Sequence, residues 1–306
     1  MLFRSYSWEP HPIAPFQLQN NSAEIRRIRE RIEALTSAKA QPASGEQGEN
    51  ARVEDVPSDN RVAAPIDRLV DAIDERTALV PVSLVLFRSA CVQDVAPVIE
   101  KAHRVGARVI LDVYQAAGTI PLDLAALGTD FAVGGSVKWL CGGPGAGYLY
   151  VRPDLIGELQ PAQVGWAGHA APFAFETGPV RYAAGIERFQ SGTPNVPALA
   201  SARSGYRIVG EVGVPAIRAK SLRLTRRLID AARARGWALN TPDDDRQRGG
   251  SVVIDVPDGA SVTARLIERG VIVDHRPDAG IRIAPHFYST DAEIDRAVEV
   301  LNELTN

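Results

Sequence analysis

The stretch that most constrains this chain covers residues 108–151, RVILDVYQAAGTIPLDLAALGTDFAVGGSVKWLCGGPGAGYLYV. Its three short apolar runs predict buried strands over residues 108–113, 130–134 and 148–151. The first run ends near an acid, Asp112, and the second leads into a lysine, Lys138, in a loop rich in glycine and serine. Because open α/β sheets bind ligands at the carboxyl ends of their strands, this pattern predicts a site with one carboxylate and one amine.

Two uses are open to Lys138. Most single lysines keep the ammonium in solvent and carry no further role. Here Gly134, Gly135 and Ser136 precede the lysine and a glycine run follows it, so the backbone can approach a bulky ligand closely. A lysine amine near low-dielectric surroundings loses its proton more readily and forms a Schiff base with a carbonyl. The natural carbonyl partner of such an amine is pyridoxal phosphate.

Asp112 and Gln115 fit the same chemistry, although simpler roles are open to both. Pyridoxal phosphate withdraws electrons while its ring nitrogen is protonated, and a buried carboxylate beside that nitrogen keeps the proton in place. Asp112 stands at a strand end, where an acid also serves as a turn cap. Gln115 follows three residues later and lies either beside the ring oxygen and the lysine or in the loop as a plain polar residue.

Residues 111–152 resemble the core of the class V aminotransferase superfamily, pyridoxal-phosphate enzymes of fold type I that include cysteine desulfurases and kynureninases. Three later motifs are most similar to kynureninase: VGWAGHAAPFAFE, GIERFQSGTPNVPAL and GIRIAPHFYST. The resemblance runs from about Asp59 to the C-terminus. It implies an α/β fold, with a mainly parallel sheet in a large domain and a smaller C-terminal α/β domain.

The resemblance also implies which side chains hold the cofactor. They are Lys138, Asp112, Gln115, Ser136, Trp166 and Thr193. Lys138 matches the Schiff-base lysine, and Asp112 matches the acid on the pyridine nitrogen. Trp166 and Thr193 match residues near the cofactor phosphate that kynureninases contribute across a dimer interface. A homodimer is therefore implied as well.

For the substrate, the resemblance implies an amino acid held at its α-carboxylate. Arg282 matches the arginine that grips this carboxylate, a task suited to its planar fork. Arg88 follows an expected strand, close to where family members place polar active-site residues, and a plain solvated arginine is an equal alternative. His169 lies in a family-like motif and either lines the substrate pocket or is a structural histidine.

Two positions depart from the kynureninase pattern and leave the substrate open. Kynureninases usually carry a tyrosine directly before the lysine, where this chain has Val137. They also carry a histidine where this chain has Gln115, which is closer to some aminotransferase relatives. The expected function is hydrolytic β–γ cleavage of an L-kynurenine-type substrate. The alternatives are a class V aminotransferase, a carbon–sulfur lyase, or a truncated non-catalytic homologue that acts as a binding subunit.

The first 59 residues give the argument for the non-catalytic alternative. Fold type I enzymes place several βα units, including the loop that binds the cofactor phosphate, before the segment that matches here. In this sequence no glycine occurs before Gly45, so the usual anion cradle at a helix N-terminus is not visible. The large domain is therefore expected to be incomplete at its N-terminus. A partner chain, or Trp166 and Thr193 across a dimer, are the alternative sources of phosphate contacts.

The order of apolar patterns predicts three parts: residues 1–59 as an arm, a helix over 23–35 and a flexible linker; residues 60–213 as the cofactor-binding domain; and residues 214–306 as the small domain. In the second part we expect a helix at 66–73, a strand at 79–87, a helix at 94–105 and an irregular segment at 153–197. In the rest we expect helices at 198–212, 216–235 and 261–269, strands at 251–256, 271–274 and 281–284, and a final helix. Thr290 and Glu293 have capping-box spacing at the start of that helix.

Composition excludes several other function classes. The net charge of −3 gives no electrostatic reason to expect nucleic acid or an anionic membrane as partner. No apolar run approaches the ~20 residues that a membrane span needs. The five histidines have no metal-ligand spacing, so no metal site is expected. Cysteine occurs only at Cys91 and Cys141, which suggests a reducing compartment and a cytoplasmic protein.

Overall fold

The computed structural model of this chain describes residues 54–56 and 62–305. Backbone contacts divide the chain into Met1–Asp55 and Val56–Asn306, and all the helices and strands named here lie in the second unit. The predicted arm, the helix at 23–35 and most of the linker lie outside the described residues. Across the described ranges, no helix is both long and apolar enough to cross a membrane. The same residues contain no group of three or more His, Cys, Asp or Glu side chains that could hold a metal ion.

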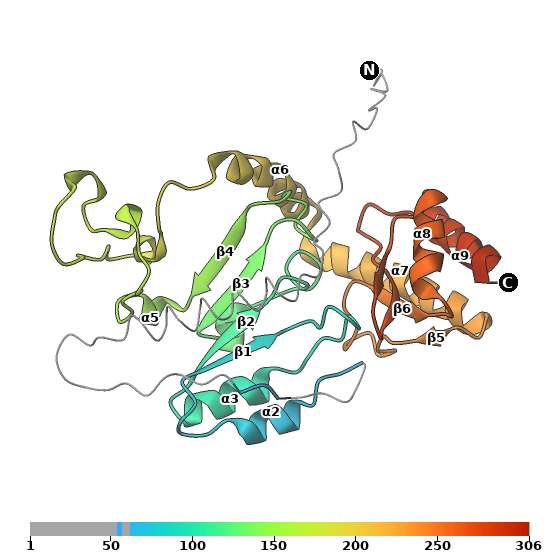
Figure 1. The fold of residues 1–306 in the computed structure, drawn as a ribbon, viewed down its shortest axis with the longest axis horizontal. Coiled ribbons are helices and arrows are strands. Elements are labelled where there is room, and N and C mark those ends of the chain that lie inside the picture. Colours follow the sequence, from blue (N-terminus) through green and yellow to red (C-terminus); the bar gives the residue numbers. More distant parts are fainter. Residues whose placement is uncertain (1–53, 57–61, 306) are drawn as a thin grey trace, which may run out of the picture. The chain divides into compact units, whose positions relative to one another are not determined.

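The first sheet contains strands β1 (Leu79–Ser83), β2 (Arg108–Asp112), β3 (Phe131–Gly135) and β4 (Gly147–Val151), in that order (Figure 1). Strands β1, β2 and β3 run parallel, whereas β4 runs antiparallel to β3. The predicted mainly parallel sheet in an α/β fold is thus confirmed, and β4 returns through the glycine-rich loop as its antiparallel edge. The short helix α4 (Leu124–Leu127) lies between β2 and β3.

One face of this sheet is buried under helices α2 (Ile66–Ala72) and α3 (Ala96–Arg104) (Figure 1). Alternate residues of β1 and β2 are buried, as expected for strands with one covered face. On α3 the buried residues are Val98, Ile99 and Ala102, which share one stripe of the helix. Each fully buried valine or isoleucine contributes roughly 1.5–3 kcal/mol, so this layer fixes the sheet that carries the site.

Register brings the ends of neighbouring strands to one edge. Ser83, at the end of β1, is paired with Asp112, at the end of β2, and Asp112 is paired with Val133 on β3. The strand predicted over 79–87 stops at Ser83, and the chain continues as an irregular segment through Phe87. The carboxyl ends of three strands therefore open on the same region.

The segment predicted to be irregular, 153–197, contains only the short helices α5 (Pro153–Ile156), η1 (Trp166–Gly168), η2 (Pro172–Ala174) and η3 (Ile186–Phe189). Buried Arg188 organises it by donating hydrogen bonds to the carbonyls of Ala183, Gly157 and Leu159, at 2.9–3.0 Å. The segment ends where Asn195 caps α6 (Val196–Val212) by accepting from the backbone N–H of Ala198 at 3.2 Å.

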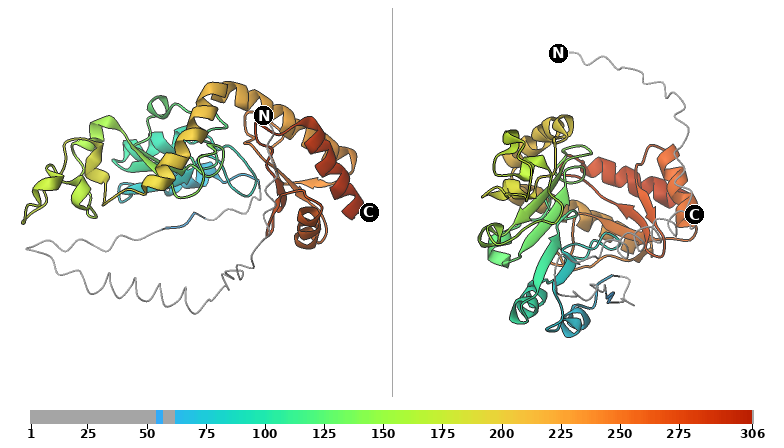
Figure 2. Two further views of the ribbon diagram at one scale, coloured as in Figure 1. Left: turned by 90° about the horizontal axis from the view of Figure 1, so that it is seen from above. Right: turned by 60° about the vertical axis from the view of Figure 1, so that its left-hand side comes forward.

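The second sheet is antiparallel, in the order β5 (Ala238–Leu239), β6 (Val252–Asp255), β8 (Gly280–Ile283) and β7 (Asp274–Arg276). Helices α7 (Val214–Ala234), α8 (Gly259–Glu268) and α9 (Asp291–Thr305) pack with β6 and β8 in a second apolar core. Figure 2 follows the chain from α6, in yellow, into α7, in orange. The predicted capping box is confirmed: Thr290 N–H donates to Glu293 Oε2 at 2.6 Å, and Glu293 N–H donates to Thr290 Oγ1 at 3.2 Å.

Two details of this sheet differ from the sequence prediction. The strand expected at 271–274 lies at Asp274–Arg276, because Val271 N–H donates to the Leu266 carbonyl and so closes the end of α8. Strand β5 was not expected, since two residues are too few to show a period.

Candidate active site

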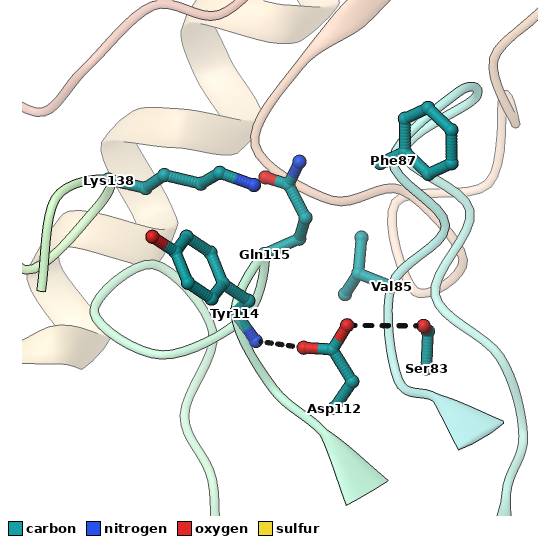
Figure 3. Close-up of a pocket in the computed structure, with 7 residues that line it drawn as sticks. All are labelled: Ser83, Val85, Phe87, Asp112, Tyr114, Gln115 and Lys138. Atoms are coloured by element: carbon teal, nitrogen blue, oxygen red, sulfur yellow. Dashed lines mark hydrogen bonds between the residues drawn. The ribbon is translucent and has the colours of Figure 1, made fainter. Parts of the chain in front are cut away.

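A cavity of about 390 Å³ opens at the carboxyl ends of the parallel strands (Figure 3). Its lining consists of Ser83, Val85, Phe87, Asp112, Tyr114, Gln115 and Lys138. These residues come from the ends of β1 and β2 and from the loop that follows β3. The carboxylate and the amine that the sequence placed at strand ends therefore share one cavity, and Gln115 lies between them.

Asp112 lines this cavity, and its carboxylate is oriented by uncharged hydrogen-bond donors. Its Oδ1 accepts from the backbone N–H of Tyr114 at 2.8 Å, and its Oδ2 lies 3.4 Å from the Ser83 hydroxyl (Figure 3). Neither partner carries a positive charge, so the negative charge of the carboxylate is not neutralised by its hydrogen-bond donors. A cationic ligand atom in the cavity would find a fixed carboxylate facing it.

Lys138 is half-buried and lies across the Tyr114 ring, with Nζ 4.3 Å from the ring centroid (Figure 3). Burial lowers the pKa of Lys138 below its ordinary value, and the positive charge of Arg282 lowers it further. Asp112 acts in the opposite direction but does not cancel these effects. The amine is therefore neutral, and nucleophilic, over a wider pH range than an exposed lysine.

Gln115 connects the lysine to the second sheet. With its amide oxygen turned toward both donors, it accepts from Lys138 Nζ at 2.9 Å and from the NH1 group of Arg282 at 3.3 Å. This fits the expectation that Gln115 lies beside the lysine. It also brings Arg282, on β8, to the edge of the cavity.

Arg282 is almost fully enclosed, with a side chain that is 12% exposed. Its Nε and NH2 groups donate to the two oxygens of Asp274 at 3.1 and 2.6 Å, and its NH1 group donates to the Phe87 carbonyl at 2.8 Å. Arg88 points elsewhere, since its guanidinium donates to the Pro277 carbonyl at 2.5 Å. Of the two predicted substrate arginines, Arg282 hydrogen-bonds two residues that line the cavity, whereas the Arg88 guanidinium pairs with the turn between β7 and β8.

Ser136 does not line the cavity, although it precedes Lys138 by two residues. Its side chain is fully buried, and its hydroxyl lies 2.6 Å from the Tyr206 hydroxyl on α6. Its backbone N–H donates to the Ala146 carbonyl at 2.9 Å. The geometry thus gives Ser136 a role in fixing the lysine loop against α6.

Trp166, His169 and Thr193 also lie away from the cavity lining, in the irregular segment before α6. Trp166 is 45% exposed and packs on Phe173, with ring centroids 5.5 Å apart. His169 Nδ1 accepts from the backbone N–H of Ala171 at 3.0 Å. Thr193 is exposed. Within one chain these three residues are not brought to Lys138.

The sequence reasoning missed Tyr114, and it misread the two glycines of β3. A Cβ at Gly135 would lie 2.6 Å from a ring carbon of Tyr114, and a Cβ at Gly134 would overlap the hydroxyl of Tyr148. Burial raises the pKa of Tyr148 to about 12. These glycines were expected to admit a ligand, but they make room for two tyrosine rings. The position of Tyr114 between Asp112 and Gln115 was the only signal in the sequence.

The lining suits the ring and the carbonyl end of pyridoxal phosphate. A cavity of about 390 Å³ falls within the range of roughly 300–1,000 Å³ that small-molecule sites occupy. Asp112 offers a carboxylate for a protonated ring nitrogen, Lys138 offers an amine with a lowered pKa for the carbonyl, and Gln115 offers an amide beside that amine. The donor set therefore agrees with the cofactor that the sequence resemblance implied.

Comparison with known proteins gives the same family. The model of the aminotransferase class-V family matches residues 35–296. The match therefore begins closer to the N-terminus than Asp59, the start of the resemblance that the sequence motifs indicated. The kynureninase of Pseudomonas fluorescens is 34% identical over 246 residues, covering 78% of this chain and 58% of that protein. The uncharacterized aminotransferase YcbU of Bacillus subtilis is 31% identical over 235 residues, covering 77% of this chain and 62% of that protein. The chain thus spans about three-fifths of the length of these relatives.

Solved structures share the fold. The apo cysteine desulfurase of Thermococcus onnurineus NA1 superposes with a TM-score of 0.72 at 21% identity, covering 82% of this chain and 66% of that one. The cystine C–S lyase C-DES superposes with a TM-score of 0.67 at 23% identity, covering 78% and 64%. A variant of that lyase has been solved with glycine covalently linked to its pyridoxal phosphate cofactor. The present chain therefore belongs to the class V aminotransferase family, whose members are pyridoxal-phosphate enzymes of fold type I.

Proposed function

We propose that this chain is a pyridoxal-phosphate enzyme, or the larger part of one, that cleaves a kynurenine-type amino acid by hydrolysis at the β–γ bond. The observation that carries the proposal is the link from Lys138 through Gln115 to Arg282, above the carboxylate of Asp112. An amine and an acid in one cavity, with a guanidinium at its edge, support this assignment. The kynureninase relative supports the choice of reaction.

Four residues would bind and orient the reactants. Asp112 would pair with the ring nitrogen of pyridoxal phosphate, Lys138 would attach the cofactor through Nζ, and Gln115 would contact the ring oxygen beside that attachment. Arg282 would receive the α-carboxylate of the substrate. When bound, pyridoxal phosphate supplies an electron-withdrawing ring that stabilises negative charge at the substrate α-carbon.

Lys138 would also move the proton at the α-carbon. Its Nζ, at the lining of the cavity and with a lowered pKa, would act as the base that takes this proton. Once it carries the proton, the ammonium lies over the ring face of Tyr114, and a cation over an aromatic ring is attracted to its electrons. The same group would return a proton once the bond has been cleaved.

We also propose a homodimer in the cytoplasm, in which Trp166 and Thr193 reach the cofactor phosphate of the partner subunit. Both residues are exposed in the single chain, so they are accessible to a second copy. The free thiols of Cys91 and Cys141 suit a reducing compartment.

A class V aminotransferase or a carbon–sulfur lyase is the alternative, and Gln115 is the observation that favours it. In kynureninases a histidine stands at this position, whereas Gln115 matches some aminotransferase relatives, and YcbU is among the similar proteins. A non-catalytic binding subunit is the other alternative, and cofactor attachment separates it from an enzyme.

The test is cofactor attachment to the full chain. Purified protein is mixed with pyridoxal phosphate, reduced with borohydride and digested, and mass spectrometry locates the pyridoxyl group. We expect the group on Lys138 in the wild type, its loss in Lys138→Ala, and its retention in Lys220→Ala, a control on α7. L-kynurenine is then assayed for release of alanine, and other L-amino acids for transamination. A folded chain that takes no pyridoxyl group on Lys138 would rule out the enzyme and leave the binding subunit.

A further inference from the structure

The hydrogen bonds of Arg282 leave little room for a substrate. A guanidinium has five N–H groups, and a carboxylate binds best across two parallel N–H groups on one edge. The edge formed by Nε and NH2 is occupied by both oxygens of Asp274. The NH1 group is occupied by the Phe87 carbonyl and by Gln115. A substrate carboxylate that binds across two parallel N–H groups must therefore displace one of these partners.

Asp274 is the partner that can leave most easily. The Phe87 acceptor is a backbone carbonyl, fixed by the chain on both sides. Asp274 is a side chain that is 42% exposed, so solvent reaches it. Its oxygens also have the same chemistry and spacing as an α-carboxylate, so exchange of one carboxylate for another leaves the fork of Arg282 satisfied.

Asp274 has a second cation ready to receive it. Arg276 donates from NH2 to the same Oδ2 atom that Arg282 holds, at 2.9 Å. The sheet fixes this arrangement, because Asp274 and Arg282 are register partners on β7 and β8 and Arg276 lies two residues further along β7. The Arg276 guanidinium also lies 5.9 Å from the Phe87 ring, at the cavity lining. An Asp274 side chain that leaves Arg282 therefore keeps one ion pair.

We propose that Asp274 is an internal stand-in for the substrate carboxylate, held on Arg282 until a ligand carboxylate displaces it onto Arg276. The inference rests on the proposed function, since it takes Arg282 as the carboxylate grip. Asp274 is then a specificity-determining residue. A ligand without a carboxylate cannot replace it on the arginine fork, whereas an amino acid can.

Binding of propionate to the full chain, measured by isothermal titration calorimetry, tests the proposal. Propionate carries the carboxylate but no amine, so it probes Arg282 without reacting at Lys138. We expect Asp274→Asn to bind propionate about tenfold more tightly than the wild type, because the competing carboxylate is gone. Arg276→Gln should bind it several-fold more weakly, because the displaced carboxylate loses its second partner.

Asp278→Asn is the matched control. It removes the same charge from the same hairpin, but Asp278 faces Arg88, with 3.4 Å between the charged atoms. We expect its affinity for propionate to equal that of the wild type. Circular dichroism of each variant verifies that it is folded, and Arg276→Gln tests the proposal with Asp274 left in place.

Three outcomes overturn the inference and separate it from the proposed function. Weaker or unchanged binding in Asp274→Asn, with binding lost in Arg282→Gln, means that Asp274 only orients Arg282 and that the carboxylate grip stands. Unchanged binding in Arg282→Gln means that Arg282 is not the grip, which removes the substrate contact from the proposed function as well. If propionate binds neither the wild type nor Asp274→Asn, Arg282 is again not the grip, and the proposed function loses its substrate contact.

Discussion

Each end of the first sheet carries an aspartate, and the two carboxylates differ in the charge of their partners. Asp130 lies directly before β3, at the end of the sheet opposite the cavity, and is 1% exposed. It accepts from the backbone N–H of Val109 at 2.7 Å and lies 2.9 Å from both His103 Nε2 and Arg152 NH1. Asp112, at the end of β2, has only neutral donors and faces the cavity.

The comparison separates a structural carboxylate from one that is available to a ligand. The charge of Asp130 is matched by Arg152, and its other side-chain partner is His103, so it ties α3, β2 and the start of α5 to one end of the sheet. The hydrogen bonds of Asp112 hold its orientation and leave its charge uncompensated by a cation in contact. The surrounding charge, rather than burial alone, therefore distinguishes the candidate site acid from the structural one.

Asp130→Asn should have the largest effect, which is a decrease in the free energy of unfolding. Replacement leaves Arg152 and His103 without their anion at a buried position. Both partner side chains are about one-third exposed, so we expect a loss of about 2–3 kcal/mol rather than the full cost of breaking a fully buried pair. Urea unfolding measures it. An equal loss in Asp112→Asn would contradict the distinction between the two ends.

Asp112→Asn should weaken the binding of pyridoxal phosphate and leave the stability of the fold almost unchanged. The substitution keeps the shape of the side chain, so we expect the free energy of unfolding in urea to change by less than about 1 kcal/mol. The dissociation constant of pyridoxal phosphate should rise by at least about tenfold, because the anion beside the ring nitrogen is lost. Fluorescence titration measures it. Unchanged affinity would show that another group pairs with the ring.

Arg282→Gln should change the pH response of Lys138. The positive charge of Arg282 lowers the pKa of Lys138, second only to burial, so its removal raises that pKa toward the ordinary value. Labelling by acetic anhydride requires the neutral amine, so the labelling–pH profile of Lys138, read by mass spectrometry, should move to higher pH. Arg265→Gln, an exposed arginine on α8, is the control and should leave the profile in place. A shift to lower pH would contradict the assignment.

Tyr114→Leu should give the smallest change. A ring under an ammonium stabilises the charged form by about 0.5–1 kcal/mol, so its loss should lower the pKa of Lys138 and move the same labelling profile to lower pH. Tyr114→Phe keeps the ring face and should leave the profile close to that of the wild type. If the two variants behave alike, the hydroxyl rather than the ring controls the amine.

The sequence by itself determined the elements whose residues alternate or repeat within a few positions. The strands around Asp112 and Lys138, the stripe on α3 and the capping box at Thr290 were all readable, because each depends on local periodicity and local hydrogen bonds. The family resemblance added Arg282 as a predicted substrate contact, whereas Gln115 was predicted from its position three residues after Asp112. Since parallel strands present their carboxyl ends at one edge, the meeting of the acid and the amine followed from the pattern as well.

Only the tertiary structure decided which side chains face each other across long stretches of chain. It turned Ser136 toward Tyr206, filled the space beside Gly135 with Tyr114, and placed Asp274 on the fork of Arg282. None of these contacts has a period or a spacing, because each depends on the register of one strand against another and on the packing of segments far apart in sequence. The electrostatic difference between Asp112 and Asp130 has the same origin, since their partners come from other elements.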